Sequence, residues 1–328
     1  MPKLEIYPPE NPTESWPLKI SQSGLTITSK TTVERAIFQF DGCHDLTFLG
    51  MNFRNCSPFR GKGCTHITLR DCWFDGIAPT MLQQVELHPG NDDWLLERVL
   101  FENAPNAIYS RLGEEESANR ITIRSCLGRN LYSDDGHFIG IQGGHGHVIE
   151  GNESYDTGTA IEFWERSFRP MTNSIVKHNR ISRCRNRKNE EGKDTTDGCG
   201  IKISGSLDYG TPLPAPGDRG GFVITENEIF DTEGHGISTN IRDWVGIIAN
   251  IIRDTGRDAL HFACPIDMAR ALLRDNVVRN PKGRFVWCDG MVDAKGNDYT
   301  ADSNSYFYLA GKIYTRKEWM KDIEGVEP

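Results

Sequence analysis

Carboxylates, a lysine and aromatic residues occupy matching positions in several short segments of alternating apolar residues. Glu162 lies in the segment Ala-Ile-Glu-Phe-Trp that ends at Trp164, and Lys202 holds the same position in Gly-Ile-Lys-Ile-Ser. Two carboxyl groups on either side of a glycosidic bond can cleave it, one as the acid and the other as nucleophile or base. We predict that Glu162 protonates the leaving oxygen, and that Asp135 or Asp197 is the nucleophile or activates water.

These segments predict strands whose outward side chains form two columns, because alternate residues of a strand face opposite sides. The first column holds Glu86, Tyr109, Gly140, Glu162, Lys202, Ser238 and His261, and the second holds His88, Arg111, Gln142, Trp164, Ser204, Asn240 and Ala263. Aromatic rings on such a face stack on sugar rings, and the cations and amides bind hydroxyl or acid groups. The predicted substrate-binding residues are Trp164, Tyr109, Arg111, Gln142, Glu86, His88, Asn240, Arg242, His235 and His261.

The turns just before these strands carry further titratable residues. His137 follows the Asp135 turn, and we count it and Lys202 among the candidate catalytic residues. Each of these residues also has an ordinary interpretation as a turn residue or an exposed ion-pair partner. The sequence His145-Gly-His147 lacks a third ligand at a usual spacing, so no metal and no cofactor are predicted.

A second repeated phrase predicts how these strands are stacked. The phrase is apolar-x-apolar, then two or three residues, then Asn and a further apolar residue, with Asn at 152, 179, 227, 250 and 276. Upstream, the same position holds Met51, Cys72, Val99 and Cys126. Successive positions lie 21 to 27 residues apart, except for one step of 48 that contains an insertion. Stacked Asn side chains can satisfy the polar groups of a buried turn, so each step predicts one coil of a solenoid.

We therefore predict an all-β fold, a right-handed parallel β-helix of about nine coils with an Asn ladder, in a single domain over residues 1–328. Residues 1–35 form the N-terminal cap region, 36–305 the coils and 306–328 the C-terminal cap. Thr315 and Glu318 have the spacing of a helix capping box. A short helix there would cover the last coil and block edge pairing.

The coil phrase, the Asn ladder and the Gly-x-apolar-x-apolar strands resemble the pectate-lyase-like superfamily of parallel β-helix proteins. The resemblance covers residues 25–310. It implies a carbohydrate-active protein but not one activity, because the superfamily includes hydrolases, lyases, epimerases, tailspikes and structural proteins.

Three functions compete. Glycoside hydrolysis by Glu162 is the first. A polysaccharide lyase or uronate epimerase is the second, in which Lys202 with Arg242 or Arg111 supplies the base and the cation that stabilises an enolate-like anion. A non-catalytic glycan-binding or tailspike-like module is the third, and it would tolerate Glu162→Gln.

Composition excludes other classes of partner. The net charge of −9 argues against nucleic acid, and no apolar run is long enough to span a bilayer. No signal peptide is visible, which predicts a cytoplasmic protein as the sequence stands, or a secreted or periplasmic one if a leader was trimmed. The nine cysteines show no metal spacing, and we predict reduced core residues. The sequence does not indicate an oligomeric state.

Overall fold

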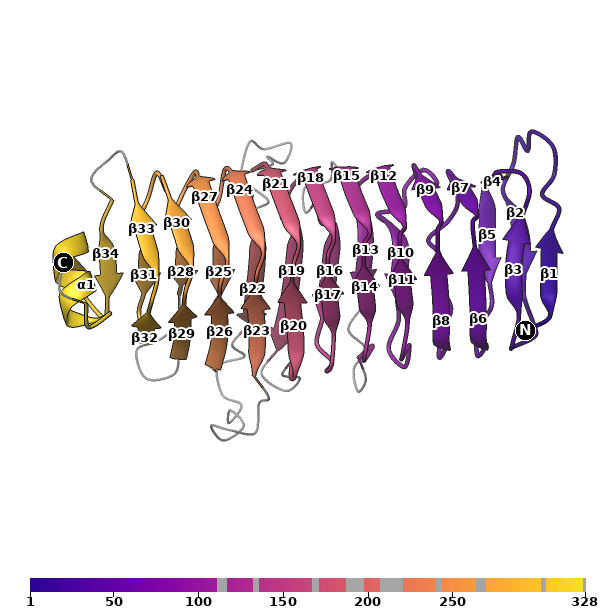
Figure 1. Ribbon diagram of the computed structural model, residues 1–328. Coiled ribbons are helices and arrows are strands. Elements are labelled where there is room, and N and C mark those ends of the chain that lie inside the picture. The colour runs from indigo at the N-terminus through magenta and orange to yellow at the C-terminus, as the bar shows by residue number, and fades with distance from the viewer. Residues whose placement is uncertain are drawn as a thin grey trace.

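The computed structural model describes residues 1–110, 117–131, 136–166, 171–186, 198–206, 221–239, 244–263, 270–301 and 305–326. Its strands form an elongated stack, with the N-terminus at one end and the only helix of the described residues at the other (Figure 1). Paired strands run parallel, except for the antiparallel pair of β34 and β35. Among the described residues, no helix is long and apolar enough to cross a membrane.

Three long sheets make up the stack. The 12-stranded sheet contains β1 (Lys3–Ile6), β3 (Thr26–Ser29), β6 (His44–Leu49), β8 (Thr65–Arg70), β11 (Leu95–Glu97), β14 (Thr122–Arg124), β17 (Val148–Glu150), β20 (Ser174–Lys177), β23 (Phe222–Thr225), β26 (Trp244–Ile248), β29 (Arg270–Arg274) and β32 (Met291–Lys295). The 11-stranded sheet contains β4 (Val33–Glu34), β7 (Asn52–Arg54), β9 (Trp73–Asp75), β12 (Leu100–Ala104), β15 (Leu127–Leu131), β18 (Glu153–Thr157), β21 (Arg180–Cys184), β24 (Glu228–Thr232), β27 (Ile251–Thr255), β30 (Val277–Arg279) and β33 (Asp298–Thr300).

The third sheet carries the predicted columns. This 10-stranded sheet contains β10 (Gln83–Leu87), β13 (Asn106–Ser110), β16 (Ile139–Gln142), β19 (Ile161–Arg166), β22 (Ile201–Ser206), β25 (Ile237–Thr239), β28 (Leu260–Phe262), β31 (Val286–Cys288), β34 (Phe307–Leu309) and β35 (Lys312–Tyr314). A small sheet of β2 (Trp16–Lys19) and β5 (Ala36–Gln39) lies at the N-terminal end. Each central coil visits the three long sheets in turn, and their inward residues form one apolar core.

A tight corner joins the 12-stranded and 11-stranded sheets in each coil. The residue before the predicted slot has a positive φ, for example 52° at Arg98, 54° at Ser125 and 55° at His178. This left-handed residue bends the chain from one sheet into the next and turns the following side chain inward. The slot residue is buried in consequence, whether it is Val99 or Asn179.

The Asn ladder is present and is longer than predicted. Each amide donates through Nδ2 to Oδ1 of the next, at 2.8–3.0 Å, from Asn152 through Asn179, Asn227, Asn250 and Asn276 to Asn297. At its end, Asn297 Nδ2 donates to Glu324 Oε1 at 2.9 Å. The ladder therefore satisfies a column of buried amides from one coil to the next.

The parallel β-helix and its capping helix are confirmed, but the stack exceeds about nine coils because its longest sheet has 12 strands. The additional strands include β1, β3 and β4, which precede the first recognised slot at Met51 and extend the sheets within residues 1–35. Helix α1 (Arg316–Asp322) has Thr315 as its N-cap and the predicted capping box with Glu318. Its Trp319 is fully buried and stacks on Phe307 of β34, with ring centroids 4.5 Å apart.

The cysteines that the structure describes are buried and free, in agreement with the prediction of reduced core residues. In several coils the thiol donates to a backbone carbonyl of the core, as Cys72 does to Phe48 O at 3.4 Å. Cysteine therefore fits these buried corners because it is small and its thiol is a weak hydrogen-bond donor.

Candidate functional site on the 10-stranded sheet

The first predicted column is confirmed by the strand register. Partners across the sheet follow the order Glu86, Tyr109, Gly140, Glu162, Lys202, Ser238 and His261, and Trp287 and Tyr308 extend it. In the second column, Gln142 pairs with Trp164 and Trp164 with Ser204. Neighbouring strands lie about 4.8 Å apart, so each column presents one side chain per coil at that spacing.

Glu162 on β19 is the centre of a hydrogen-bonded cluster. Its Oε2 accepts from Nε2 of His137, which comes from the corner before β16. Its Oε1 accepts from Ser204 Oγ at 2.7 Å and lies 3.5 Å from Lys202 Nζ, both on β22. The side chain of Glu162 is 15% exposed and that of Lys202 is 26% exposed. The cluster therefore joins three neighbouring coils and leaves the lysine as its more exposed cation.

The surroundings of Glu162 favour its ionised form. Burial alone would raise the pKa, but the hydrogen bond and charge of His137, the charge of Lys202 and the hydrogen bond from Ser204 outweigh it and lower the pKa to about 2. Glu162 is therefore a carboxylate at neutral pH. Both of its oxygens are occupied within the cluster.

Glycine at position 140 gives Tyr109 its place beside this cluster. A Cβ on Gly140 would lie 2.7 Å from Cδ2 of Tyr109, closer than real Cβ contacts allow. The Tyr109 hydroxyl accepts a hydrogen bond from Nε2 of Gln142. Trp164 is 37% exposed, so its ring is available on the outer face next to Glu162.

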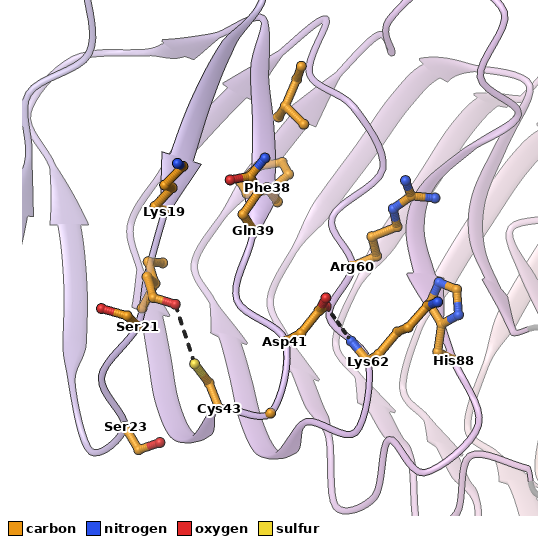
Figure 2. A pocket seen from close by; sticks show the side chains of 13 residues that line it. Lys19, Ser21, Ser23, Phe38, Gln39, Asp41, Cys43, Arg60, Lys62 and His88 are labelled. Carbon is orange, nitrogen blue, oxygen red and sulfur yellow. Dashed lines mark hydrogen bonds between the residues drawn. The ribbon is translucent and has the colours of Figure 1, made fainter.

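Glu86 and His88 lie at the N-terminal end of the same sheet. Glu86 is only 1% exposed, with its carboxylate 3.2 Å from His88 Nε2 and 3.6 Å from Arg60 Nη1. Its carboxylate is thus covered, which does not fit direct contact with a substrate. Its charge instead holds Arg60 and His88, which line a cavity of about 960 Å³ together with Lys19, Lys62 and Asp41 (Figure 2).

His235 and His261 lie together toward the other end. His261 is two strands beyond Lys202 in the first column, and its ring centroid is 4.1 Å from that of His235 and 4.0 Å from that of Trp287. His261 Nδ1 donates to Asp258 Oδ2 at 2.9 Å. Burial lowers the pKa of His235 to about 4.

Five predicted residues lie outside the described ranges. They are Asp135, Asp197, Arg111, Asn240 and Arg242. Among the described residues of the face, Ser204 and Asp258 had been given no role, and Arg60 and Trp287 were missed. The segment Phe-Val-Trp-Cys has the same apolar alternation as the other strands, so Trp287 was detectable from the sequence.

The sequence matches no protein-family model and no curated protein. Solved structures nevertheless share its architecture. A rhamnogalacturonan lyase matches at 12% identity with a TM-score of 0.51, over 80% of this chain and 75% of the other. The surface protein and adhesin PfbA of Streptococcus pneumoniae matches at 11% and 0.56, over 87% and 84%.

The catalytic unit of the thermostable GH87 alpha-1,3-glucanase of Streptomyces thermodiastaticus matches at 13% and 0.57, over 91% of this chain and 61% of that one. A lyase, an adhesin and a glucanase thus share one scaffold. The chain therefore shares the parallel β-helix fold of these three proteins.

Proposed function

We propose that this chain is a carbohydrate-active enzyme that binds a poly- or oligosaccharide along the outer face of the 10-stranded sheet and breaks a glycosidic bond at the Glu162 cluster. The observation that carries the proposal is a nearly buried, ionised carboxylate that holds His137, Lys202 and Ser204 beside the exposed ring of Trp164. Charged clusters with perturbed pKa values in a face lined by aromatic rings are typical of functional sites.

The surroundings of Glu162 support a role other than the predicted proton donor. A general acid at neutral pH needs a raised pKa, whereas that of Glu162 is lowered to about 2. An ionised carboxylate with both oxygens bonded instead fixes the position of its partners. In our proposal Glu162 orients the Lys202 ammonium toward the face, and Trp164 stacks on the neighbouring sugar.

This arrangement favours elimination from an acidic sugar over hydrolysis. A base must remove the proton α to the substrate carboxylate, and Arg111 or Arg242 is our candidate for that base. The negative charge that builds on the substrate carboxylate is stabilised by a fixed cation. The C–O bond to the leaving sugar then breaks as the double bond forms, and the leaving oxygen takes up a proton from the protonated base or from water. Lys202, with 26% of its side chain exposed, is the more exposed cation of the cluster. The name of the rhamnogalacturonan lyase that shares the fold is consistent with this chemistry. Hydrolysis is the alternative, with Glu162 as nucleophile or base and Asp135 or Asp197 as the acid.

A panel of acidic and neutral polysaccharides tests the proposal. Elimination gives an unsaturated product that absorbs in the ultraviolet, whereas hydrolysis gives new reducing ends without that absorbance. Lys202→Met should lower turnover about 100-fold or more, because the cation that stabilises the anion is lost. Lys177→Met is the matched control, since Lys177 pairs with Glu150 at 3.1 Å on the 12-stranded sheet and is 29% exposed.

Each outcome has a clear meaning. Reducing ends without ultraviolet absorbance would replace elimination by hydrolysis. Full turnover by Lys202→Met would contradict the role of the cluster. Tight binding of a glycan with no product from any polysaccharide would make the chain a glycan-binding module instead of an enzyme.

A further inference from the structure

We infer that His235, Asp258 and His261 form a binding site for a divalent transition metal ion on the same face of the stack. One ligand atom from each residue lies within 4.8 Å of the other two. Two imidazoles and a carboxylate are a common donor set for zinc and its neighbours in the first transition series. The inference does not rest on the proposed function.

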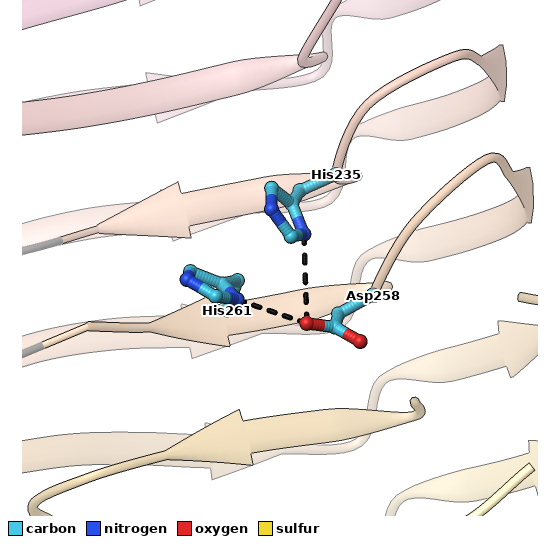
Figure 3. A group of neighbouring side chains, drawn as sticks. All are labelled: His235, Asp258 and His261. Carbon is cyan, nitrogen blue, oxygen red and sulfur yellow. Dashed lines mark hydrogen bonds and ion pairs between the residues drawn. The ribbon is translucent and has the colours of Figure 1, made fainter. Parts of the chain in front are cut away.

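Stacked corners bring the three residues together. His235 lies in the corner before β25 and Asp258 in the equivalent corner before β28, and Gly236 N donates to Asp258 O at 3.2 Å. His261 follows Asp258 by three residues on β28. Figure 3 shows that the two imidazoles point at the same carboxylate oxygen.

The distances suit a shared ion. Asp258 Oδ2 lies 2.9 Å from His261 Nδ1 and 3.8 Å from His235 Nδ1. Metal–ligand bonds of about 2.0–2.1 Å in a tetrahedral site put ligand atoms roughly 3.4 Å apart, between these two values. Small side-chain rotations would therefore bring all three atoms to bonding distance.

An orphaned nitrogen supports a ligand at this point. His235 Nδ1 is buried and has no hydrogen-bond partner among the described residues, although it faces a carboxylate. Buried polar atoms of this kind usually have a partner, such as an ion or a water molecule. A metal would bind the lone pair at His235 Nδ1, and His261 would bind through Nδ1 with its proton moved to Nε2.

Arg284 is the group that opposes a cation here. Its Nη1 lies 3.5 Å from Asp258 Oδ2, and its guanidinium carbon lies 5.3 Å from the ring centroids of both Trp287 and Tyr306. Its backbone N–H also donates to Asp258 Oδ1 at 2.8 Å, which leaves Oδ2 for the metal. Because its charge repels a metal ion, removing that charge should tighten metal binding.

Calorimetric titration of the EDTA-treated full chain with Zn²⁺, and visible spectra with Co²⁺, test the inference. We expect one ion per chain and the intense Co²⁺ absorption of a tetrahedral site. His235→Gln and Asp258→Asn should weaken binding about 100-fold, since each removes one of three ligands. His178→Gln is the control, because His178 is exposed and pairs with Glu226 on another face.

Arg284→Met provides a test that does not remove a ligand. It should tighten Zn²⁺ binding by about threefold or more, as expected when a nearby like charge is removed. The inference is overturned if the wild type binds no ion, if His235→Gln binds as tightly as wild type, or if Arg284→Met weakens binding. If either ligand variant fails to fold, the Co²⁺ spectrum of the wild type and the Arg284→Met titration still decide between the outcomes.

Discussion

Replacing Glu162 by glutamine tests the ionised state of the central carboxylate without knowledge of the substrate. Glutamine keeps the shape of the side chain and removes its charge. The difference between the ordinary pKa of 4.5 and the value of about 2 in the fold, at about 1.4 kcal/mol for each pH unit, corresponds to about 3 kcal/mol at pH 7. We expect Glu162→Gln to lower the free energy of unfolding by that amount.

The pH dependence has a definite sign. The folded pKa is below the unfolded one, so the charge stabilises the fold above about pH 4.5, and this stabilisation is lost as the pH falls toward 2. The difference between wild type and Glu162→Gln should therefore shrink from about 3 kcal/mol at pH 7 to about 2 kcal/mol at pH 3.5.

Urea unfolding followed by intrinsic fluorescence at several pH values measures this difference. Glu153→Gln is the matched control: Glu153 is 49% exposed and pairs with Arg180 at 3.4 Å, so its loss should cost less than about 1 kcal/mol. If Glu162→Gln were as stable as wild type at pH 7, or if the difference did not depend on pH, our description of Glu162 would be refuted.

Three further predictions concern other parts of the fold. The side chain of Asn227 donates to Val176 O, Thr225 O and Asn250 Oδ1 and accepts twice from Asn179. Asn227→Ala removes all of these hydrogen bonds, so urea unfolding should show a free energy of unfolding lower by roughly 3–5 kcal/mol. A decrease below about 1 kcal/mol would show that the ladder does not stabilise the fold. Gly140→Ala should displace Tyr109 and lower turnover while circular dichroism and the unfolding midpoint stay near wild type; unchanged turnover would remove Tyr109 from the site. Burial raises the pKa of Cys56, Cys126 and Cys184 to about 12, so a thiol reagent should label them only after unfolding, and labelling in the native protein would contradict their burial.

The sequence predicted the scaffold well because two periodic signals agree. The apolar alternation orients side chains, and the Asn slot fixes the register between coils, so the order from Glu86 to His261 was predictable residue by residue. The strands β1, β3 and β4 precede Met51, the first recognised slot residue, and escaped the count. Asn297 lies 21 residues after Asn276, within the range of the other steps, and was overlooked.

The chemistry of the face was less predictable because it depends on contacts between coils. The low pKa of Glu162 comes from His137 in a corner, from Lys202 in the same column and from Ser204 in the second column. The place of Lys202 beside Glu162 follows from the column, but the contacts with His137 and Ser204 do not. Glu86 is 1% exposed, and its carboxylate lies 3.6 Å from Arg60 Nη1, which comes from a segment without the repeated phrase. The pairing of Asp258 with His261 spans a corner and a strand, whose relative orientation no periodicity specifies.

The Asn ladder has a direction, and this gives the C-terminal segment a second task. Every amide from Asn152 onward donates toward the C-terminal end, so the dipoles of the column add and its last N–H group carries partial positive charge. Glu324 places a carboxylate at that point. A chain truncated before Glu324 would leave the Asn297 amide without its hydrogen-bond acceptor, even if another helix covered the apolar core. Each coil that carries Asn makes the same contact with the next coil, whereas the last Asn needs the Glu324 carboxylate. A variant with added or removed coils should therefore keep the segment from Thr315 to Glu324 intact.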